Sequence, residues 1–303
     1  METLRLIIPA STSNIGPGFD TLGIAVKLYN ELEVERAKRR VGVEFERGVE
    51  RNFQDRIRRM VRKTVRAFEE VSGREISGVR LLFRNDVPIA RGLGSSATFR
   101  MGTLEAMNKW TGEPLDRGTL LNIGCKIERH TENCVASVFG GMTASGFINE
   151  QVQYARFDIS SEMTFVAAVP HRPMSTAETR KILPRRVTLA DAVYNLNRTV
   201  LLLHALGKGD FHQLGDLLDD KLHQPYRSKV MRPLFAVIEA ARQAGAWGAF
   251  LSGSGSTIMA IATKKVEKVA QAMKSTLDEK GWPADIHLLE ADDQGIHVVN
   301  GEE

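Results

Sequence analysis

The spacing of hydrophobic residues predicts strands and helices in the first part of the chain. LRLII at 4–8 predicts a first strand, apolar and polar residues alternate as in a strand in VRLLFRNDV at 79–87, and a further strand is expected through LYNELEVE at 28–35. Residues 51–72 instead predict a helix that ends at Gly73. Its apolar positions recur every three or four residues, at Ile57, Val61, Val65, Phe68 and Val71.

Two more helices and a returning strand are expected next. Residues 100–112 predict a helix that ends near Gly112, and Asp116 is expected to cap a helix over 117–130. The segment TENCVASVFGGMTASGF at 131–147 is then expected to turn back into a strand.

The pattern restarts near residue 163. A strand at 163–170 precedes a short helix at 176–183, which stops before Pro184. Thr188 and Asp191 form a capping-box pattern at the start of a long helix. The remaining expected elements are a polar helix, a loop at 222–227 (LHQPYR), a helix at 233–245, two strands flanking 251–256, a helix at 264–280 and a last strand at 284–291.

Strands and helices are mixed along the chain, but their spacing is irregular for a doubly wound parallel sheet. The pattern therefore favours an α+β fold with two halves that join near 150–160. We place the boundary so that one domain covers 1–155 and the other covers 156–303. At 303 residues the chain is long enough for a large core in either one domain or two.

Charge adds little to this picture. The 41 Lys and Arg residues against 37 Asp and Glu residues leave a net charge of +4, which is too small to indicate nucleic-acid binding. The helix at 51–72 does have a basic face, but no aromatic residues are interleaved with it, so a solvated face is favoured over a nucleic-acid contact. That face consists of Arg58, Arg59, Arg62, Lys63 and Arg66.

Cysteine content and hydropathy point to a cytoplasmic protein that does not bind a membrane. Cys125 and Cys134 give no disulfide framework, as expected in a reducing compartment. METLRLIIPASTS at the start of the sequence lacks the basic region of a signal peptide, and no apolar stretch approaches the length that spans a bilayer.

The stretch PIARGLGSSATF at 88–99 predicts an anion site. It places glycines between a strand and a helix, so that backbone N–H groups and the positive end of the helix can surround a phosphate. The loop lacks the Lys-Ser/Thr pair of a Walker A loop and the spacing of a dinucleotide fingerprint. A plain turn with Ser95 as the helix N-cap is the alternative.

Two other glycine loops have similar composition. SNIGPGFDTLG at 13–23 combines glycines with Asn14 and Asp20, which offer an amide and a carboxylate beside a flexible backbone. LSGSGSTIM at 251–259 is a Gly-Ser turn between apolar strands, and a tight hairpin would explain it equally well.

In combination, the three loops resemble the motifs of the GHMP family of small-molecule kinases. The second motif of that family, Pro-x-x-x-Gly-Leu-Gly-Ser-Ser-Ala, is complete at 88–97. Segments at 9–26, 175–184 and 222–227 are similar to those of family members that phosphorylate homoserine. Because the likeness runs over nearly the whole chain, the sequence is identified as a member of this family.

The resemblance implies a two-domain α+β kinase with its active site between the domains. The N-terminal half is expected to be ribosomal-protein-S5-like and the C-terminal half ferredoxin-like. The implied reaction is ATP-dependent phosphorylation of L-homoserine to O-phospho-L-homoserine, a step toward threonine. A homodimer is a further expectation at the level of the family.

On the donor side, the resemblance assigns ATP to the second motif and Mg²⁺ to Ser96 and Glu128, a hydroxyl and a carboxylate that suit a hard cation. Arg91 is a further candidate for phosphate contact. The segment KIERHTENCVASVFGG at 126–141 departs from the family pattern, and a solvated helix position is the alternative for Glu128. The motif residues are Pro88, Ile89, Ala90, Arg91, Gly92, Leu93, Gly94, Ser95, Ser96 and Ala97.

On the acceptor side, Thr176, Arg180 and Arg227 match positions that hold the carboxylate of the amino acid, for which the arginine fork is suited. Asn14 and Asp20 match positions near the substrate, where Asp20 would pair with the α-ammonium group. His223 and Gln224 are expected to shape the loop that presents Arg227.

His130 and Asn133 are expected to line the site near the reacting hydroxyl. An ordinary structural hydrogen bond is an equally good interpretation of His130. An amide such as Asn133 cannot act as a base near neutral pH, so we expect phosphoryl transfer without a dedicated side-chain base.

Two other functions stay open on the sequence. One is a kinase of the same family that acts on another alcohol, such as threonine or mevalonate. The other is a nucleotide-binding regulator that kept the loops and lost catalysis, for which the altered segment ERHTEN at 128–133 is the main support.

Overall fold

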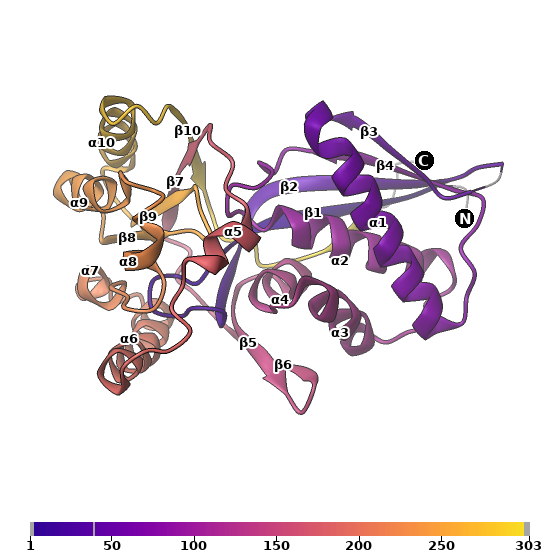
Figure 1. Ribbon diagram of the computed structural model, residues 1–303, viewed down its shortest axis with the longest axis horizontal. Coiled ribbons are helices and arrows are strands. Elements are labelled where there is room, and N and C mark those ends of the chain that lie inside the picture. Colours follow the sequence, from indigo (N-terminus) through magenta and orange to yellow (C-terminus); the bar gives the residue numbers. More distant parts are fainter. Residues whose placement is uncertain (1–2, 39, 300–303) are drawn as a thin grey trace.

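The computed structural model describes residues 3–38 and 40–299 and has two halves, each built on its own β-sheet (Figure 1). The N-terminal sheet has seven strands in the order β11-β1-β2-β4-β3, and β5 pairs with both β2 and β6. Its strands are β1 (Thr3–Ser13), β2 (Leu22–Arg36), β3 (Gly42–Arg47), β4 (Val79–Asn85), β5 (Met142–Ile148), β6 (Gln151–Phe157) and β11 (His297–Val299).

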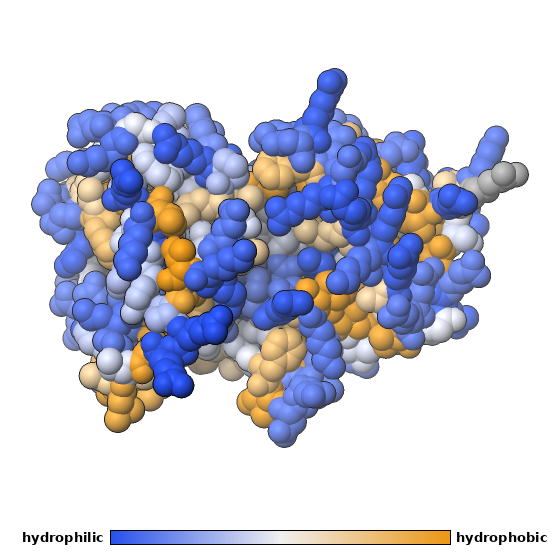
Figure 2. All heavy atoms as spheres, in the orientation of Figure 1, coloured by the Kyte–Doolittle hydropathy of each residue, from blue (hydrophilic) through white to orange (hydrophobic). Residues whose placement is uncertain are grey.

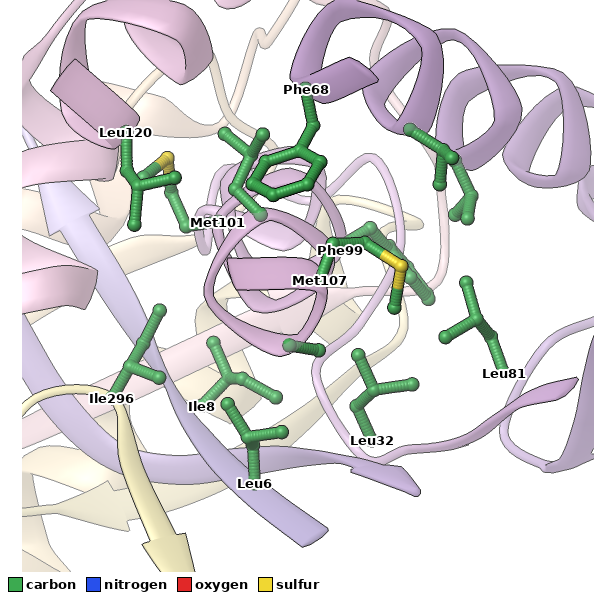
Figure 3. Close-up of a cluster of buried hydrophobic side chains, with 14 of the residues drawn as sticks. Leu6, Ile8, Leu32, Phe68, Leu81, Phe99, Met101, Met107, Leu120 and Ile296 are labelled. Atoms are coloured by element: carbon green, nitrogen blue, oxygen red, sulfur yellow. The ribbon is translucent and has the colours of Figure 1, made fainter. Parts of the chain in front are cut away.

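Four helices cover one face of this sheet (Figure 1). They are α1 (Arg51–Ser72), α2 (Ser95–Trp110), α3 (Arg117–Glu128) and α4 (Glu132–Phe139). The central helix, α2, is buried on nearly every side, because the sheet lies below it and α1 lies across it. Figure 3 shows the resulting core, in which Phe99 and Met107 of α2 lie between Phe68 of α1 and the strand residues Leu32 and Leu81.

The C-terminal half is built on an antiparallel sheet of four strands in the order β10-β7-β9-β8. The strands are β7 (Thr164–Pro170), β8 (Gly248–Leu251), β9 (Ile258–Ala262) and β10 (Ala284–Leu289). Its helices are α5 (Thr176–Lys181), α6 (Leu189–Lys208), α7 (Leu214–Leu217), α8 (Gln224–Arg227), α9 (Leu234–Ala244) and α10 (Val266–Glu279). Helices α9 and α10 pack on one face of the sheet, and residues of α6 and α7 pack on the other.

A shared hydrophobic cluster joins the two halves. It combines Ala10 and Leu22 of the N-terminal sheet with Phe165 of β7, Leu206 of α6 and Phe250 of β8, all of them buried. The last described strand, β11, also returns to the N-terminal sheet and pairs antiparallel with β1. The two halves are therefore packed directly against each other.

The structure confirms the α+β class and most of the expected elements. Asp116 caps α3 by accepting a hydrogen bond from the Thr119 N–H at 2.9 Å, and Thr188 caps α6 in the same way. The basic face of α1 is exposed or half-exposed, as expected of a solvated face. Both cysteines are free and buried. Among the described helices, none combines the length and the apolar character that crossing a bilayer requires.

One local expectation was wrong, and several elements were not expected. The segment at 222–227 is not a plain loop, because residues 224–227 form the short helix α8 with Pro225 in its first turn. The expected return to a strand within 131–147 is confirmed by β5, but the helix α4 that precedes it was not expected. Strands β3, β6 and β11 were not expected, because each is short or mostly exposed and lacks a buried apolar run.

The surface is mostly hydrophilic in this view, with apolar side chains scattered over both halves (Figure 2). Exposed apolar residues of α6 include Leu189, Leu196 and Val200. On the β5–β6 hairpin, Ile148 and Tyr154 are exposed.

Candidate active site

A cavity lies between the two halves and collects most of the residues that the sequence analysis singled out. The N-terminal half contributes its glycine loops, the first turns of α1 and the start of α4, and the C-terminal half contributes α5 and the 253–254 turn. The predicted residues in its lining are Asn14, Asp20, Ile89, Ala90, Gly92, Gly94, Ser95, Ser96, His130, Asn133, Thr176, Arg180 and Arg227.

The backbone of the second-motif loop has the conformation that an anion site requires. Gly92 and Gly94 both have positive φ, at 82° and 70°, and α2 begins directly afterwards at Ser95. A Cβ atom at Gly94 would overlap the hydroxyl of Ser11, and one at Gly92 would overlap the carbonyl of Ser252. The glycines therefore allow the close packing that brings the first N–H groups of α2 to the cavity wall.

The interpretation of Ser95 as a helix N-cap is wrong. Gly94 occupies the N-cap position of α2, and no side-chain hydrogen bond caps the helix. The first turn of α2 thus leaves backbone donors for a ligand at the cavity.

Four motif residues lie outside the cavity lining: Pro88, Arg91, Leu93 and Ala97. The side chain of Arg91 donates hydrogen bonds to the carbonyl oxygens of Pro170 at 2.8 Å, His171 at 2.7 Å and Ile89 at 2.9 Å. This arrangement corrects the expectation that its guanidinium contacts a phosphate, because Arg91 instead ties the loop to the end of β7.

Ser96 and Glu128, the expected metal ligands, are brought into contact. The Ser96 hydroxyl donates to one carboxylate oxygen of Glu128, and Arg100 Nε contacts the other. The side chain of Glu128 is 6% exposed, so the alternative of a solvated helix position is wrong. A hydroxyl and a carboxylate that meet beside a phosphate loop fit a hard divalent cation that takes its other ligands from phosphate and water.

Arg100 is a neighbour that the sequence analysis missed. It lies one helical turn after Ser96 on α2, and its side chain is 14% exposed. The spacing of four residues was the available signal, since positions i and i+4 share one face of a helix. Its contact places a fixed positive charge beside Glu128.

Asn133 is held at the cavity wall by three hydrogen bonds. Its Oδ1 accepts from the Ser11 hydroxyl at 2.9 Å, and its Nδ2 donates to the Ser13 hydroxyl at 3.0 Å and to Glu132 Oε1 at 3.1 Å. His130 lies between two carboxylates, with Nε2 3.8 Å from Glu128 Oε1 and Nδ1 3.4 Å from Glu132 Oε1.

Glu132 is a buried carboxylate in the cavity wall to which the sequence analysis gave no role. Burial raises the pKa of its carboxyl, and the electrostatic interaction with the neighbouring His130 opposes that shift. Within residues 3–38 and 40–299, its Oε2 has no hydrogen-bond partner. Only the tertiary fold shows that this side chain enters the cavity wall rather than solvent.

On the acceptor side, Asp20 and Arg180 pair with each other. Two hydrogen bonds of 2.8 Å join the guanidinium to both carboxylate oxygens. Asn14 holds the loop in place, because its Oδ1 accepts from the Asp20 N–H at 3.0 Å and its Nδ2 donates to the Gly253 carbonyl at 2.9 Å. The Thr176 hydroxyl lies 3.1 Å from that of Ser254.

Arg227 is 2% exposed and is positioned by the backbone of Gly253 and by His223. Its NH1 group donates to the Gly253 carbonyl at 2.8 Å and lies 3.2 Å from His223 Nδ1. Burial lowers the pKa of the Arg227 guanidinium to about 10, which still leaves it charged at neutral pH. Within the described part of the chain, its buried Nε has no hydrogen-bond partner.

His223 supports Arg227 as a neutral imidazole. Complete burial lowers the pKa of His223 to about 4. Its Nε2 lies 2.8 Å from the Gly16 carbonyl, which can only accept, so Nε2 carries the proton and Nδ1 accepts from Arg227. The expectation that His223 shapes the presentation of Arg227 agrees with these contacts.

Sequence comparisons match both halves of the chain to known protein families. The family model described as GHMP kinases N terminal domain matches residues 59–141, and the model described as GHMP kinases C terminal matches residues 202–279. The chain is 34% identical over 300 residues to the homoserine kinase of Clostridium kluyveri, covering 99% of each chain. It is 36% identical to that of Caldanaerobacter subterraneus subsp. tengcongensis, covering 98% of this chain and 95% of the relative.

Solved structures share the fold. The crystal structure of homoserine kinase from Cytophaga hutchinsonii matches with a TM-score of 0.87 and 25% identity, covering 99% of this chain and 98% of the other. A mevalonate kinase from L. major, solved with R-mevalonate, matches with a TM-score of 0.72 and 17% identity over 95% of each chain, which shows the fold alone. With relatives above 30% identity along nearly its whole length, the chain belongs to the GHMP kinase family.

Proposed function

We propose that this protein transfers the γ-phosphoryl group of ATP to the side-chain hydroxyl of L-homoserine and releases O-phospho-L-homoserine. The observation that carries the proposal is a single cavity with a phosphate-type loop on one wall and Arg180, Arg227 and Thr176 on another. The first feature suits a nucleotide polyphosphate, and the second suits an amino-acid carboxylate. Curated relatives at 34% and 36% identity are homoserine kinases, which supports the same substrate.

On the donor wall, the N–H groups at the start of α2 would bind the phosphates, and the glycines at 92 and 94 allow them to approach. Ser96 and Glu128 would hold Mg²⁺, which when bound offsets the negative charge of the phosphates. His130 and Arg100 flank Glu128 and limit the orientations of its carboxylate.

On the acceptor wall, the substrate would exchange partners with an existing ion pair. Its carboxylate takes the place of Asp20 at the Arg180 fork and meets Arg227, and its ammonium group meets the freed Asp20 carboxylate. This exchange replaces each charged contact with another, so neither side chain loses its charged partner.

Asn133 would orient the reacting hydroxyl. Its amide is fixed by Ser11, Ser13 and Glu132, and an amide cannot take up the proton near neutral pH. A loose phosphoryl-transfer transition state leaves little charge on the attacking oxygen until late, so positioning supplies most of the catalysis. The proton then leaves to phosphate or water.

Two alternatives are tested by the same experiment. A kinase for another alcohol would use the same fold, as the structural match to a mevalonate kinase illustrates. A regulator without catalysis would keep the glycine loops and bind nucleotide without turnover.

The experiment is a coupled assay of ADP release from MgATP with L-homoserine, L-threonine, mevalonate or no acceptor. We expect rapid ADP release with L-homoserine, and mass spectrometry should find O-phospho-L-homoserine. Faster turnover with threonine or mevalonate would overturn the substrate assignment. ATP binding without turnover on any acceptor would favour the regulator.

The proposal also includes the domain boundary, the cellular location and the oligomeric state expected from the sequence. We propose domains at 1–155 and 156–303, which is supported by the separate four-stranded sheet that begins at β7, although β11 returns to the first sheet. We also propose a cytoplasmic homodimer that binds neither nucleic acid nor membrane. Light scattering of the purified protein checks the dimer.

A further inference from the structure

The first turns of α1 form part of the cavity wall, a contribution that the sequence analysis did not foresee. Four residues of α1 line the same cavity as Ser96 of the phosphate loop: Phe53, Arg56, Ile57 and Met60. Figure 1 shows α1 crossing over α2, with its beginning on the side nearer the C-terminal half. Three of these four side chains are apolar, so Arg56 supplies the charge on this part of the wall.

The other arginines near the cavity are already engaged. Arg180 pairs with both carboxylate oxygens of Asp20, and Arg227 donates to the Gly253 carbonyl. Arg91 lies outside the cavity lining and bonds three carbonyl oxygens. By contrast, Arg56 is exposed and forms no hydrogen bond or ion pair with any residue of the ranges 3–38 and 40–299.

A nucleotide triphosphate needs more positive charge than the loop itself supplies. The start of a helix is equivalent to about half a unit charge, and the loop at 88–97 contains no lysine. A guanidinium binds phosphate through two parallel N–H donors and stays charged at every relevant pH. An unengaged arginine on the cavity wall is therefore suited to bind the donor phosphates.

We propose that Arg56 binds the β- and γ-phosphate groups of the donor nucleotide, which AMP lacks, from the α1 side of the cavity. The proposal rests on the proposed function, because it takes the donor to be ATP. It makes α1, whose remaining basic face is solvated, a part of the donor site. In this proposal Arg56 binds the donor, whereas Arg180 and Arg227 bind the acceptor.

The test is calorimetric titration of the full-length protein with MgATP and with AMP. Arg56→Ala should weaken MgATP binding about tenfold, which corresponds to one charge-assisted contact at an exposed site, and should change AMP binding by less than about twofold. Arg59→Ala is the matched control, since Arg59 is an exposed arginine of the same helix outside the cavity lining. It should bind MgATP like the parent.

Two more readouts separate charge from packing. Arg56→Lys keeps the charge and should recover most of the lost affinity. Raising the salt concentration should weaken MgATP binding more in the parent than in Arg56→Ala, because the contact is screened.

The outcomes that overturn the inference are specific. They are MgATP binding by Arg56→Ala within twofold of the parent, an equal loss for AMP and MgATP, an equal loss in Arg59→Ala, or no recovery with lysine. Failure of the proposed function looks different, because the parent would then bind MgATP without phosphorylating homoserine.

Discussion

The two walls of the cavity are built in different ways. The donor wall is built around one loop, 88–97, six residues of which line the cavity and whose shape depends on glycines with positive φ. The acceptor wall is made of side chains from several separate segments, held by ion pairs and by hydrogen bonds to carbonyl oxygens. A local loop can be recognised as one motif, whereas the acceptor wall exists only when distant segments fold together.

The difference also concerns how each wall meets its ligand. The donor wall presents N–H groups that no other part of the loop satisfies, so a phosphate adds contacts without breaking any. The acceptor wall has already paired Asp20 with Arg180, so a ligand must replace what it breaks. A zwitterionic amino acid meets this condition because it brings both charges. We therefore expect the enzyme to select acceptors that carry both an ammonium and a carboxylate group, and to depend less on the shape of the acceptor.

The largest expected effect comes from blocking the donor wall. Gly94→Val adds a side chain at φ 70° that overlaps Ser11, and it should displace the N–H groups at the start of α2. Losing two charge-assisted hydrogen bonds, at about 1.5–3 kcal/mol each, predicts roughly a thousandfold loss of kcat/KM for ATP.

Gly112→Val is the matched control for this variant. Gly112 also has positive φ, at 84°, but a Cβ atom there would meet no atom within 4 Å. It should lose some stability and keep its ATP affinity. A folded Gly94→Val that binds ATP like the parent would contradict the phosphate role of the loop.

A second comparison removes the acceptor charges one at a time. Arg180→Ala or Arg227→Ala should lower kcat/KM for homoserine by roughly a hundredfold and leave the KM for ATP nearly unchanged, since each loses a charge-assisted contact. The exposed Arg186 provides a control, and its replacement by alanine should have no effect. Equal activity of the parent on an amino alcohol that lacks the carboxylate would count against the acceptor wall as described.

A third prediction concerns the metal ligands at the donor wall. Ser96→Ala and Glu128→Gln should each raise the Mg²⁺ concentration for half-maximal rate by about tenfold, because each removes an oxygen ligand. Titration of Mn²⁺ by electron paramagnetic resonance with ATP present measures the same change without turnover. If Glu128→Gln behaves like the parent while Ser96→Ala does not, the carboxylate is wrongly assigned.

The smallest expected effect lies where the two walls meet. His130→Gln keeps a hydrogen-bonding side chain beside Glu128 and Glu132, and it should retain at least about a tenth of kcat. Loss of a general base typically costs 10²–10⁴-fold. A fall of three orders of magnitude with intact substrate binding would instead identify His130 as the base.

The sequence by itself determined the α+β class, most helices and the donor loop. These depend on short-range information: the 3.6-residue spacing of apolar positions in α1, capping by Asp116 and Thr188, and glycines inside a ten-residue motif. The resemblance then named the acceptor residues, and the cavity lining includes all five of them, whose chemical roles stay predictions.

The tertiary structure alone decided which charged groups face one another. Asp20 and Arg180 are 160 residues apart, so no local pattern could show that they satisfy each other. The same applies to Arg91, which bonds the Pro170 carbonyl oxygen at the end of β7, and to Glu132, whose burial follows from the packing of α4 on the N-terminal sheet. Local spacing fixes the shape of a segment, but the pairing and desolvation of a charge depend on every segment packed around it.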